Sequence, residues 1–237
     1  MINKIILMIL AFSSAIVNSQ NIIGAWEMSR TSKQGVLIKN VVIFTEGYQV
    51  ISRYESETGK FIGCNGGTWK LNDGIMTEKV EFDTQTPERI GNEVRFEIAI
   101  TDTTLNIVGA NKRIFKRIDN GTPGKLQGAW LMSGKMRDGR VQSRDINRPR
   151  KTMKILSGSR FQWIAYNTET KQFMGTGGGT YNTYNGKYTE NIEFFSRDNS
   201  KVGASLEFNF TMNHGKWHHQ GFSSKGNAIH EIWTIRP

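Results

Sequence analysis

The sequence YESETGKFIGCNGGTWKLNDGIMTEKVEF, at residues 54–82, returns at residues 166–194 as YNTETKQFMGTGGGTYNTYNGKYTENIEF. The two stretches align without a gap at a constant shift of 112 residues, and 13 of the 29 positions are identical. Upstream, the triplet Gly24-Ala25-Trp26 recurs as Gly128-Ala129-Trp130. A repeat of this length exceeds the roughly 20–50 residues of a solenoid unit, so the chain contains one domain twice.

The first 20 residues have the layout of a secretory signal peptide. One charge, at Lys4, precedes an apolar run from Ile5 to Val17, and polar or small residues follow at residues 18–20. The apolar run is shorter than the roughly 20 residues of a transmembrane helix, and no cysteine follows it that could carry a lipid anchor. We therefore expect an exported protein, secreted or periplasmic, that does not span the membrane.

The rest of the chain divides into the two copies of the repeat. We assign residues 1–20 to the signal peptide, 21–119 to the first copy, 120–125 to a linker and 126–237 to the second copy. The linker is polar and contains glycine and proline, as domain junctions do. Cys64 is the only cysteine, so no internal disulfide can form. Each copy must therefore be stabilised by its own hydrophobic core.

Apolar residues alternate with polar ones along most of both copies, a period typical of half-buried β-strands. In residues 206–212, LEFNFTM, every second side chain is apolar. Turn sequences such as Asn72-Asp73-Gly74 and Tyr184-Asn185-Gly186 suit tight hairpins between strands. Roughly eight strands per copy would leave exposed edges unless each sheet closes on itself. The sequence thus predicts an all-β fold of two tandem antiparallel up-and-down β-barrels, with a β-sandwich as the alternative.

The Gly-x-Trp triplets that open both copies are similar to the signature of the lipocalin and avidin group, the calycins. That resemblance implies a lipocalin-like barrel whose floor is closed by the tryptophan. In such barrels a basic residue from the last strand lies over the tryptophan, which is a cation–π contact. The resemblance therefore implies that Trp26 and Trp130 close the two floors, with Arg117 and Arg236 as the candidate basic residues.

The second copy also resembles a secreted bacterial domain family of unknown function, labelled only as membrane or secreted protein. The resemblance rests on GGGTY at residues 177–181, GKYTENIEF at 186–194, WHH at 217–219 and HEIW at 230–233. The first copy matches less well, because Leu105-Asn106-Ile107 stands in place of the Trp-His-His triplet. This family has no established activity, so the resemblance implies the fold and export, and it implies no reaction and no cofactor.

A glutamate recurs on the predicted inward face of the same strand in both copies. Glu190 alternates with Tyr188 and Ile192 in the second copy, and Glu78 alternates with Met76 and Val80 in the first. A carboxylate inside a barrel costs several kcal/mol unless it is paired or solvated. It either anchors a ligand or bonds a neighbouring strand, and the first copy could pair Glu78 with a basic residue such as Arg113.

The second copy has exchanged apolar interior residues for polar and aromatic ones. His219 stands where the first copy has Ile107, and Glu231 lies two residues before the tryptophan of the last strand. Aromatic walls with a few convergent polar groups are the usual composition of a ligand site. We therefore predict that the second barrel binds a partly apolar small molecule, with the first barrel as a packed support. The predicted ligand-binding residues are Glu190, His219, Glu231, Trp163, Tyr188, Trp217 and Trp233.

Other interpretations of these residues remain open. A shared metal site is disfavoured because His218 and His219 are adjacent on a strand and must point to opposite faces. Glu190 and His219 could form an acid–base pair of an enzyme acting on a sugar- or lipid-like substrate, although no motif supplies a nucleophile. His219 could equally be a hydrogen-bonded residue of the core.

Positive charge is concentrated in one stretch of a chain whose formal net charge is +10. Residues 135–151, KMRDGRVQSRDINRPRK, contain seven Lys or Arg and two Asp. The absence of interleaved aromatic residues is evidence against nucleic-acid binding. The stretch is either a solvated loop or a lip that contacts an anionic surface. The sequence is therefore consistent with three kinds of protein: an exported ligand-binding protein, a secreted enzyme, and a surface adhesion or assembly module.

Overall fold

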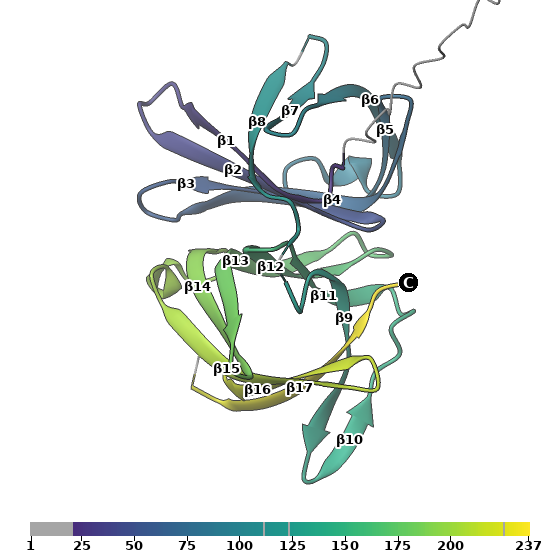
Figure 1. Ribbon diagram of the computed structural model, residues 1–237, viewed down its shortest axis with the longest axis vertical. Helices are drawn as coiled ribbons and strands as arrows, with labels where there is room; N and C mark the ends of the chain where they lie inside the picture. Colours follow the sequence, from purple (N-terminus) through teal and green to yellow (C-terminus); the bar gives the residue numbers. More distant parts are fainter. Residues whose placement is uncertain (1–20, 111, 123, 225) are drawn as a thin grey trace, which may run out of the picture.

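The computed structural model describes residues 21–237 except 111, 123 and 225, and the predicted signal peptide lies outside the described residues. The chain forms two β-barrels stacked one above the other, barrel 1 from the first copy and barrel 2 from the second (Figure 1). The predicted all-β fold with two tandem antiparallel barrels is confirmed, and the sandwich alternative is wrong.

Barrel 1 is a closed meander of eight antiparallel strands, in which each strand pairs with the next and β8 pairs back with β1. A short 3-10 helix, η1 (Pro87–Arg89), precedes β6. The strands are β1 (Gly24–Thr31), β2 (Leu37–Thr45), β3 (Tyr48–Glu55), β4 (Phe61–Asn72), β5 (Ile75–Asp83), β6 (Glu93–Ile100), β7 (Thr104–Ile107) and β8 (Arg113–Asp119).

Barrel 2 repeats this meander and closes through pairing of β17 with β9. An added strand, β10 (Arg140–Ser143), pairs with β9 and projects from the lower barrel in Figure 1. A second 3-10 helix, η2 (Asn199–Lys201), precedes β15. The barrel strands are β9 (Gly128–Arg137), β11 (Arg150–Leu156), β12 (Arg160–Asn167), β13 (Phe173–Tyr184), β14 (Lys187–Phe195), β15 (Ser205–Asn213), β16 (Lys216–Phe222) and β17 (Ala228–Ile235).

The hairpin turns follow from residues that tolerate a positive φ. Asp73 and Gly74 have φ values of 48° and 76° between β4 and β5, and Asn185 and Gly186 have 46° and 76° at the matching turn of barrel 2. Most side chains clash with the backbone in this region, whereas Gly lacks a Cβ and Asn or Asp can bond locally. The two turns therefore fix the same register in both copies.

A hydrophobic core lies between the two barrels, built from side chains that point out of each barrel. Because successive side chains alternate across a strand, the strands at this interface are apolar on both faces, toward their own barrel and toward the other. Barrel 1 contributes Ala25, Ile43, Val50, Cys64 and Phe82, and barrel 2 contributes Ala129, Leu131, Met153, Ile155, Ile164 and Tyr166, all of them buried.

Ring contacts across this interface come in symmetric pairs. Tyr54 stacks on Phe194 with ring centroids 4.8 Å apart, and Tyr166 packs on Phe82 at the same distance. Under the shift of 112 residues, Tyr54 corresponds to Tyr166 and Phe82 to Phe194. In each pair, the tyrosine of one copy therefore contacts the phenylalanine of the other copy. Reciprocal contacts of this kind are the pattern of an interface with twofold symmetry.

A residue that meets its own counterpart marks the pseudo-twofold axis. Phe61 and Phe173 occupy equivalent positions in the two copies. Their rings stack with centroids 6.0 Å apart and planes 9° from parallel. Equivalent residues touch each other only at a twofold axis, so the barrels are packed as the halves of an isologous dimer joined in one chain.

Hydrogen bonds reinforce the same symmetry. The Tyr54 hydroxyl donates to Glu193 at 2.6 Å, and the Tyr166 hydroxyl donates to Glu81 at 2.6 Å. Each carboxylate also receives a guanidinium hydrogen bond of 2.6 Å, from Arg160 in the first case and Arg236 in the second. The tyrosines and glutamates of these contacts are identical residues of the repeat, whereas the two arginines come from non-equivalent positions.

We predict that Tyr54→Phe and Tyr166→Phe each lower the free energy of unfolding by about 1–3 kcal/mol, because each leaves a partly buried carboxylate one donor short. Tyr166→Phe should cost at least as much as Tyr54→Phe, because the Tyr166 hydroxyl also accepts a hydrogen bond from Arg236 at 2.9 Å. Urea denaturation followed by tryptophan fluorescence measures both. Tyr184→Phe is the matched control, because its side chain is 74% exposed. A loss in only one of the two interface variants would contradict the symmetry.

Candidate functional site

Glu190 lies inside barrel 2 and is only 4% exposed. Its carboxylate accepts hydrogen bonds from the Lys154 ammonium at 2.6 Å and from the Tyr188 hydroxyl at 2.9 Å. Lys154 comes from β11 and was not among the residues predicted from the sequence. The signal for it was the repeat itself, because the shift of 112 aligns Lys154 with Val42, an inward-facing residue of barrel 1. Barrel 2 therefore supplies its own counterion to Glu190.

The aromatic cluster predicted for barrel 2 forms around this lysine. The ammonium nitrogen lies 5.1–5.6 Å from four ring centroids, those of Tyr188, Phe208, Trp217 and Trp233. Such rings attract a cation through their negative faces. The centre of the predicted ligand site thus holds a side chain of the protein.

His219 also points inward and is 1% exposed. Its ring lies 4.0 Å from that of Phe208, and its Nδ1 has no hydrogen-bond partner among the described residues. Burial, together with the charge of Lys154, holds the pKa of His219 well below its usual range, so the imidazole is neutral near pH 7. Glu231 pairs with His219 across β16 and β17, and burial raises the pKa of its carboxyl.

Trp163 lies at the edge of the same core and is half-buried. It packs on Phe195 with centroids 5.5 Å apart, and the Arg197 guanidinium lies 5.7 Å from its ring. Within the described part of the chain, Glu190 and His219 share no hydrogen bond. The hypothesis of an acid–base pair therefore gains no support from the geometry.

The floor contact expected in barrel 1 is present. The Arg117 guanidinium lies 3.9 Å from the ring centroid of Trp26. The Trp26 indole N–H donates to the Ile22 carbonyl at 2.9 Å, and the Trp130 indole does the same to Leu126 at 2.9 Å. Both tryptophans therefore tie the segment before the first strand to the barrel floor.

The expectation that Arg236 covers Trp130 is wrong. β17 pairs Ile235 with Trp130, and the next residue along a strand faces the opposite side. Arg236 therefore points into the interface between the barrels, where its guanidinium lies 4.0 Å from the ring centroid of Tyr48. Trp130 packs against Trp217 instead, in a T-shaped arrangement with ring centroids 5.7 Å apart.

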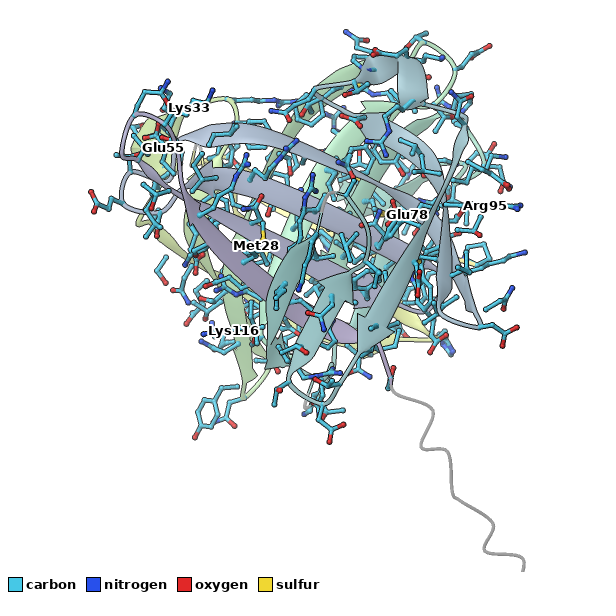
Figure 2. The ribbon with its side chains drawn as sticks, turned by 90° about the horizontal axis from the view of Figure 1, so that it is seen from above. Met28, Lys33, Glu55, Glu78, Arg95 and Lys116 are labelled. Atoms are coloured by element: carbon cyan, nitrogen blue, oxygen red, sulfur yellow. The ribbon has the colours of Figure 1, made fainter. Side chains whose placement is uncertain are left out.

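Barrel 1 contains a cavity of about 570 Å³. It reaches the surface beside Arg95 and Val108, whose side chains are exposed, and Figure 2 shows Arg95 at the edge of the molecule, with Glu78 set back among the strands. Its apolar lining is formed by Val42, Phe44, Ile51, Met76, Val94, Phe96, Ile98, Leu105, Ile107 and Phe115. The expectation that barrel 1 is a packed support is therefore wrong.

The cavity follows from the size of the interior residues. An eight-stranded barrel is just wide enough to be filled by side chains or to hold one small ligand. Large rings and a lysine fill barrel 2, whereas smaller residues leave space in barrel 1. The barrel 1 residues Val42, Met76, Leu105 and Phe115 correspond to Lys154, Tyr188, Trp217 and Trp233 of barrel 2.

Glu78 is the counterpart of Glu190 and lines this cavity. It has no lysine beside it, because Val42 stands where barrel 2 has Lys154, and it makes no hydrogen bond or ion pair within the described residues. Burial raises the pKa of Glu78 from 4.5 to about 7, and Arg89 opposes this shift. Between pH 4.5 and about 7 the folded protein binds more protons at Glu78 than the unfolded chain does. The free energy of unfolding therefore falls as the pH rises through this range.

Arginines supply most of the charge around the cavity. Arg89 pairs with Asp83 at 3.1 Å. Arg53 donates to Gln85, yet its Nε is buried without a partner among the described residues. Burial and the positive charge of Arg113 lower the pKa of Arg53. The cavity thus combines an unpaired guanidinium donor with an excess of positive charge.

In comparisons with known proteins, a family model matches the second half of the chain. Residues 125–235 match the family model described as a domain of unknown function, DUF4488. No functionally curated protein matches the sequence. Among solved structures, the chain is similar to the Cpx pathway activator NlpE from Escherichia coli, with 10% identity, a TM-score of 0.25, and coverage of 90% of this chain and 95% of that chain. Similarity of this degree carries no conclusion about function.

Two further properties concern the described residues alone. None of their helices is long and apolar enough to cross a membrane. Nor do three or more His, Cys, Asp or Glu side chains come together in them as a metal site would require. His218 and His219 do point to opposite faces, because His219 is buried in barrel 2 while His218 contacts His230 at 3.1 Å nearer the surface.

We predict that Lys154→Met lowers the free energy of unfolding by about 3–5 kcal/mol, because it leaves Glu190 buried and unpaired. Adding Glu190→Gln to Lys154→Met should restore much of the loss, and the full double-mutant cycle by urea denaturation measures the coupling.

Lys187→Met provides the matched control for this prediction. Lys187 pairs with Glu207 at 3.0 Å, but their side chains are 46% and 59% exposed. An exposed pair contributes about 0–1 kcal/mol. Equal losses of unfolding free energy from Lys154→Met and Lys187→Met would show that the buried pair contributes no more to stability than the exposed pair.

Proposed function

We propose that this protein binds a small amphipathic anion in the cavity of barrel 1. The sequence placed the ligand in barrel 2, where Lys154 and the surrounding rings now fill the interior. The cavity itself carries the proposal, since about 570 Å³ falls within the roughly 300–1,000 Å³ of typical ligand sites. Together with the export expected from residues 1–20, this describes a binding protein that acts outside the cytoplasm.

The apolar part of the ligand is suited to the inner end of the cavity. Phe44, Leu105 and Phe115 belong to the core cluster around Trp26 and also line the cavity. Hydrocarbon placed against them leaves water, which contributes about 25 cal/mol for each Å² of apolar surface buried.

The anionic part follows from the arginines. A buried donor without a partner costs about 1–3 kcal/mol, and the Arg53 Nε is such a donor. A carboxylate or another oxyanion would bond it with charge assistance and would offset the repulsion between Arg53 and Arg113. Both arginines line the cavity, so the ligand's charge has a defined place.

We predict that decanesulfonate binds the wild-type protein and that Leu105→Trp abolishes its binding, because the larger ring copies Trp217 of barrel 2 and fills the cavity. Isothermal titration calorimetry measures both. Ile75→Trp adds the same ring at a side chain that is 42% exposed and should bind as the wild type does. Binding that survives Leu105→Trp would place the ligand elsewhere.

We predict that decanesulfonate binds more weakly as the pH rises from about 6 to about 8, because Glu78 loses its proton near pH 7 and then repels the anion. The sulfonate stays ionised throughout, so the change must arise in the protein. The other acidic side chain that lines the cavity, Asp83, is paired with Arg89 at 3.1 Å.

Glu78→Gln is the control for this pH dependence. The amide cannot ionise, so the variant should bind with nearly the same affinity at both ends of the range. A pH dependence that persists in Glu78→Gln would assign the titration to another group.

A further inference from the structure

The eight-residue insertion that distinguishes barrel 2 creates a second hollow at its mouth. The two copies align at a shift of 104 residues at Trp26 and Trp130, and at 112 from β2 onward. The extra residues extend β9 and form β10, whereas β1 and β2 of barrel 1 are joined by a short turn at residues 32–36. A pocket of about 310 Å³ lies against this hairpin.

The lining of this pocket is basic. Its charged residues are Lys135, Arg144, Arg148 and Arg150, and Gln142 and Ser143 add neutral hydrogen-bonding groups. No Asp or Glu lines it. Met132, which lies against the barrel 2 core, forms the apolar base.

Arg144 is held in place by neutral acceptors. Its guanidinium donates to Thr152 Oγ1 at 3.3 Å and to the Arg150 carbonyl at 3.0 Å, and its backbone N–H donates to Ser133 at 2.8 Å. None of these acceptors carries a charge. The guanidinium is therefore oriented in advance without being neutralised.

Most of the pocket's positive charges lack a carboxylate partner in the described part of the chain. In the described residues, Arg144, Arg148 and Arg150 have no carboxylate within 4.0 Å, and Lys135 lies 3.9 Å from Glu231. Elsewhere in the chain the buried guanidiniums of Arg160 and Arg236 are each paired with a glutamate. Burial and repulsion from Arg150 and Arg148 lower the pKa of Arg144.

We propose that this basic pocket binds a phosphoryl group. Guanidinium groups match the oxygens of a phosphate with paired hydrogen bonds, and an oxyanion would convert the repulsion among Arg144, Arg148 and Arg150 into attraction. The site is separate from the cavity of barrel 1 and does not depend on the function proposed for it. The phosphoryl group comes either from a free phosphate or from the headgroup of an anionic lipid.

Two titrations of the full chain test this site at low salt. Inorganic phosphate is followed by isothermal titration calorimetry. Vesicles of phosphatidylcholine with and without phosphatidic acid are followed by cosedimentation. Phosphate binding, or vesicle binding that requires phosphatidic acid, is the expected result, and the two arms distinguish the free ion from the lipid headgroup. Binding in neither arm overturns the proposal.

Two double variants separate a site from general positive charge. Arg144→Gln with Arg148→Gln removes two charges that line the pocket, and Arg137→Gln with Arg140→Gln removes two from the hairpin outside it. We expect at least a tenfold loss of affinity in the first and less than a threefold loss in the second. Equal losses would overturn the proposal, because they would show that only net charge matters.

The single variant Arg148→Gln controls for misfolding of the loop in the double variant. Arg148 makes none of the hydrogen bonds that hold Arg144, so this variant keeps the hairpin in place. It should still weaken phosphoryl binding severalfold. Unchanged affinity in Arg148→Gln, with native circular dichroism, counts against the pocket.

Discussion

The packing of two apolar barrel faces against each other is the constraint on which the rest of this structure depends. Each barrel covers the outward face of the other's first strands, and two Tyr–Glu hydrogen bonds of 2.6 Å fix the angle between them. A barrel alone would expose this face, so the arrangement makes one structural unit of the two copies. The twofold symmetry explains why the repeat keeps its tyrosine, its Glu-Phe pair and the on-axis phenylalanine: each of them contacts the other copy.

Duplication has also allowed the two interiors to diverge around one shared glutamate. In barrel 2, Glu190 forms an ion pair with Lys154, and aromatic rings enclose this pair, so it is part of the packed core. In barrel 1, Glu78 lacks that partner and lies in a cavity among arginines. The same carboxylate therefore serves packing in one copy and lines the proposed binding site in the other. The difference arises from side-chain volume at a few interior positions, above all Val42 against Lys154.

Much of the candidate site could not be predicted from the sequence. Alternation correctly placed Glu190 and His219 inside barrel 2, because side-chain direction on a strand is a local property. It could not show whether aromatic rings line a hollow or fill it, since that depends on the summed volume of residues from eight strands. The sequence pattern therefore predicts aromatic walls around a ligand, and alternation gives no signal for Lys154 because its neighbours Met153, Ile155 and Leu156 are apolar. Arg236 faces the interface and not Trp130, because one residue along a strand reverses the direction of the side chain.

The sequence by itself determined the duplication, the strand pattern and the tight turns, and it favoured closure of each copy into a barrel over a sandwich. These depend on period, on turn residues and on the cost of open edges, which are all properties of the local chain. Only the tertiary structure decided which barrel is hollow, how the barrels face each other, and that Arg144, Arg148 and Arg150 gather around one pocket. Such features depend on the packing of residues far apart in the chain, and periodicity carries no information about the volume left between them.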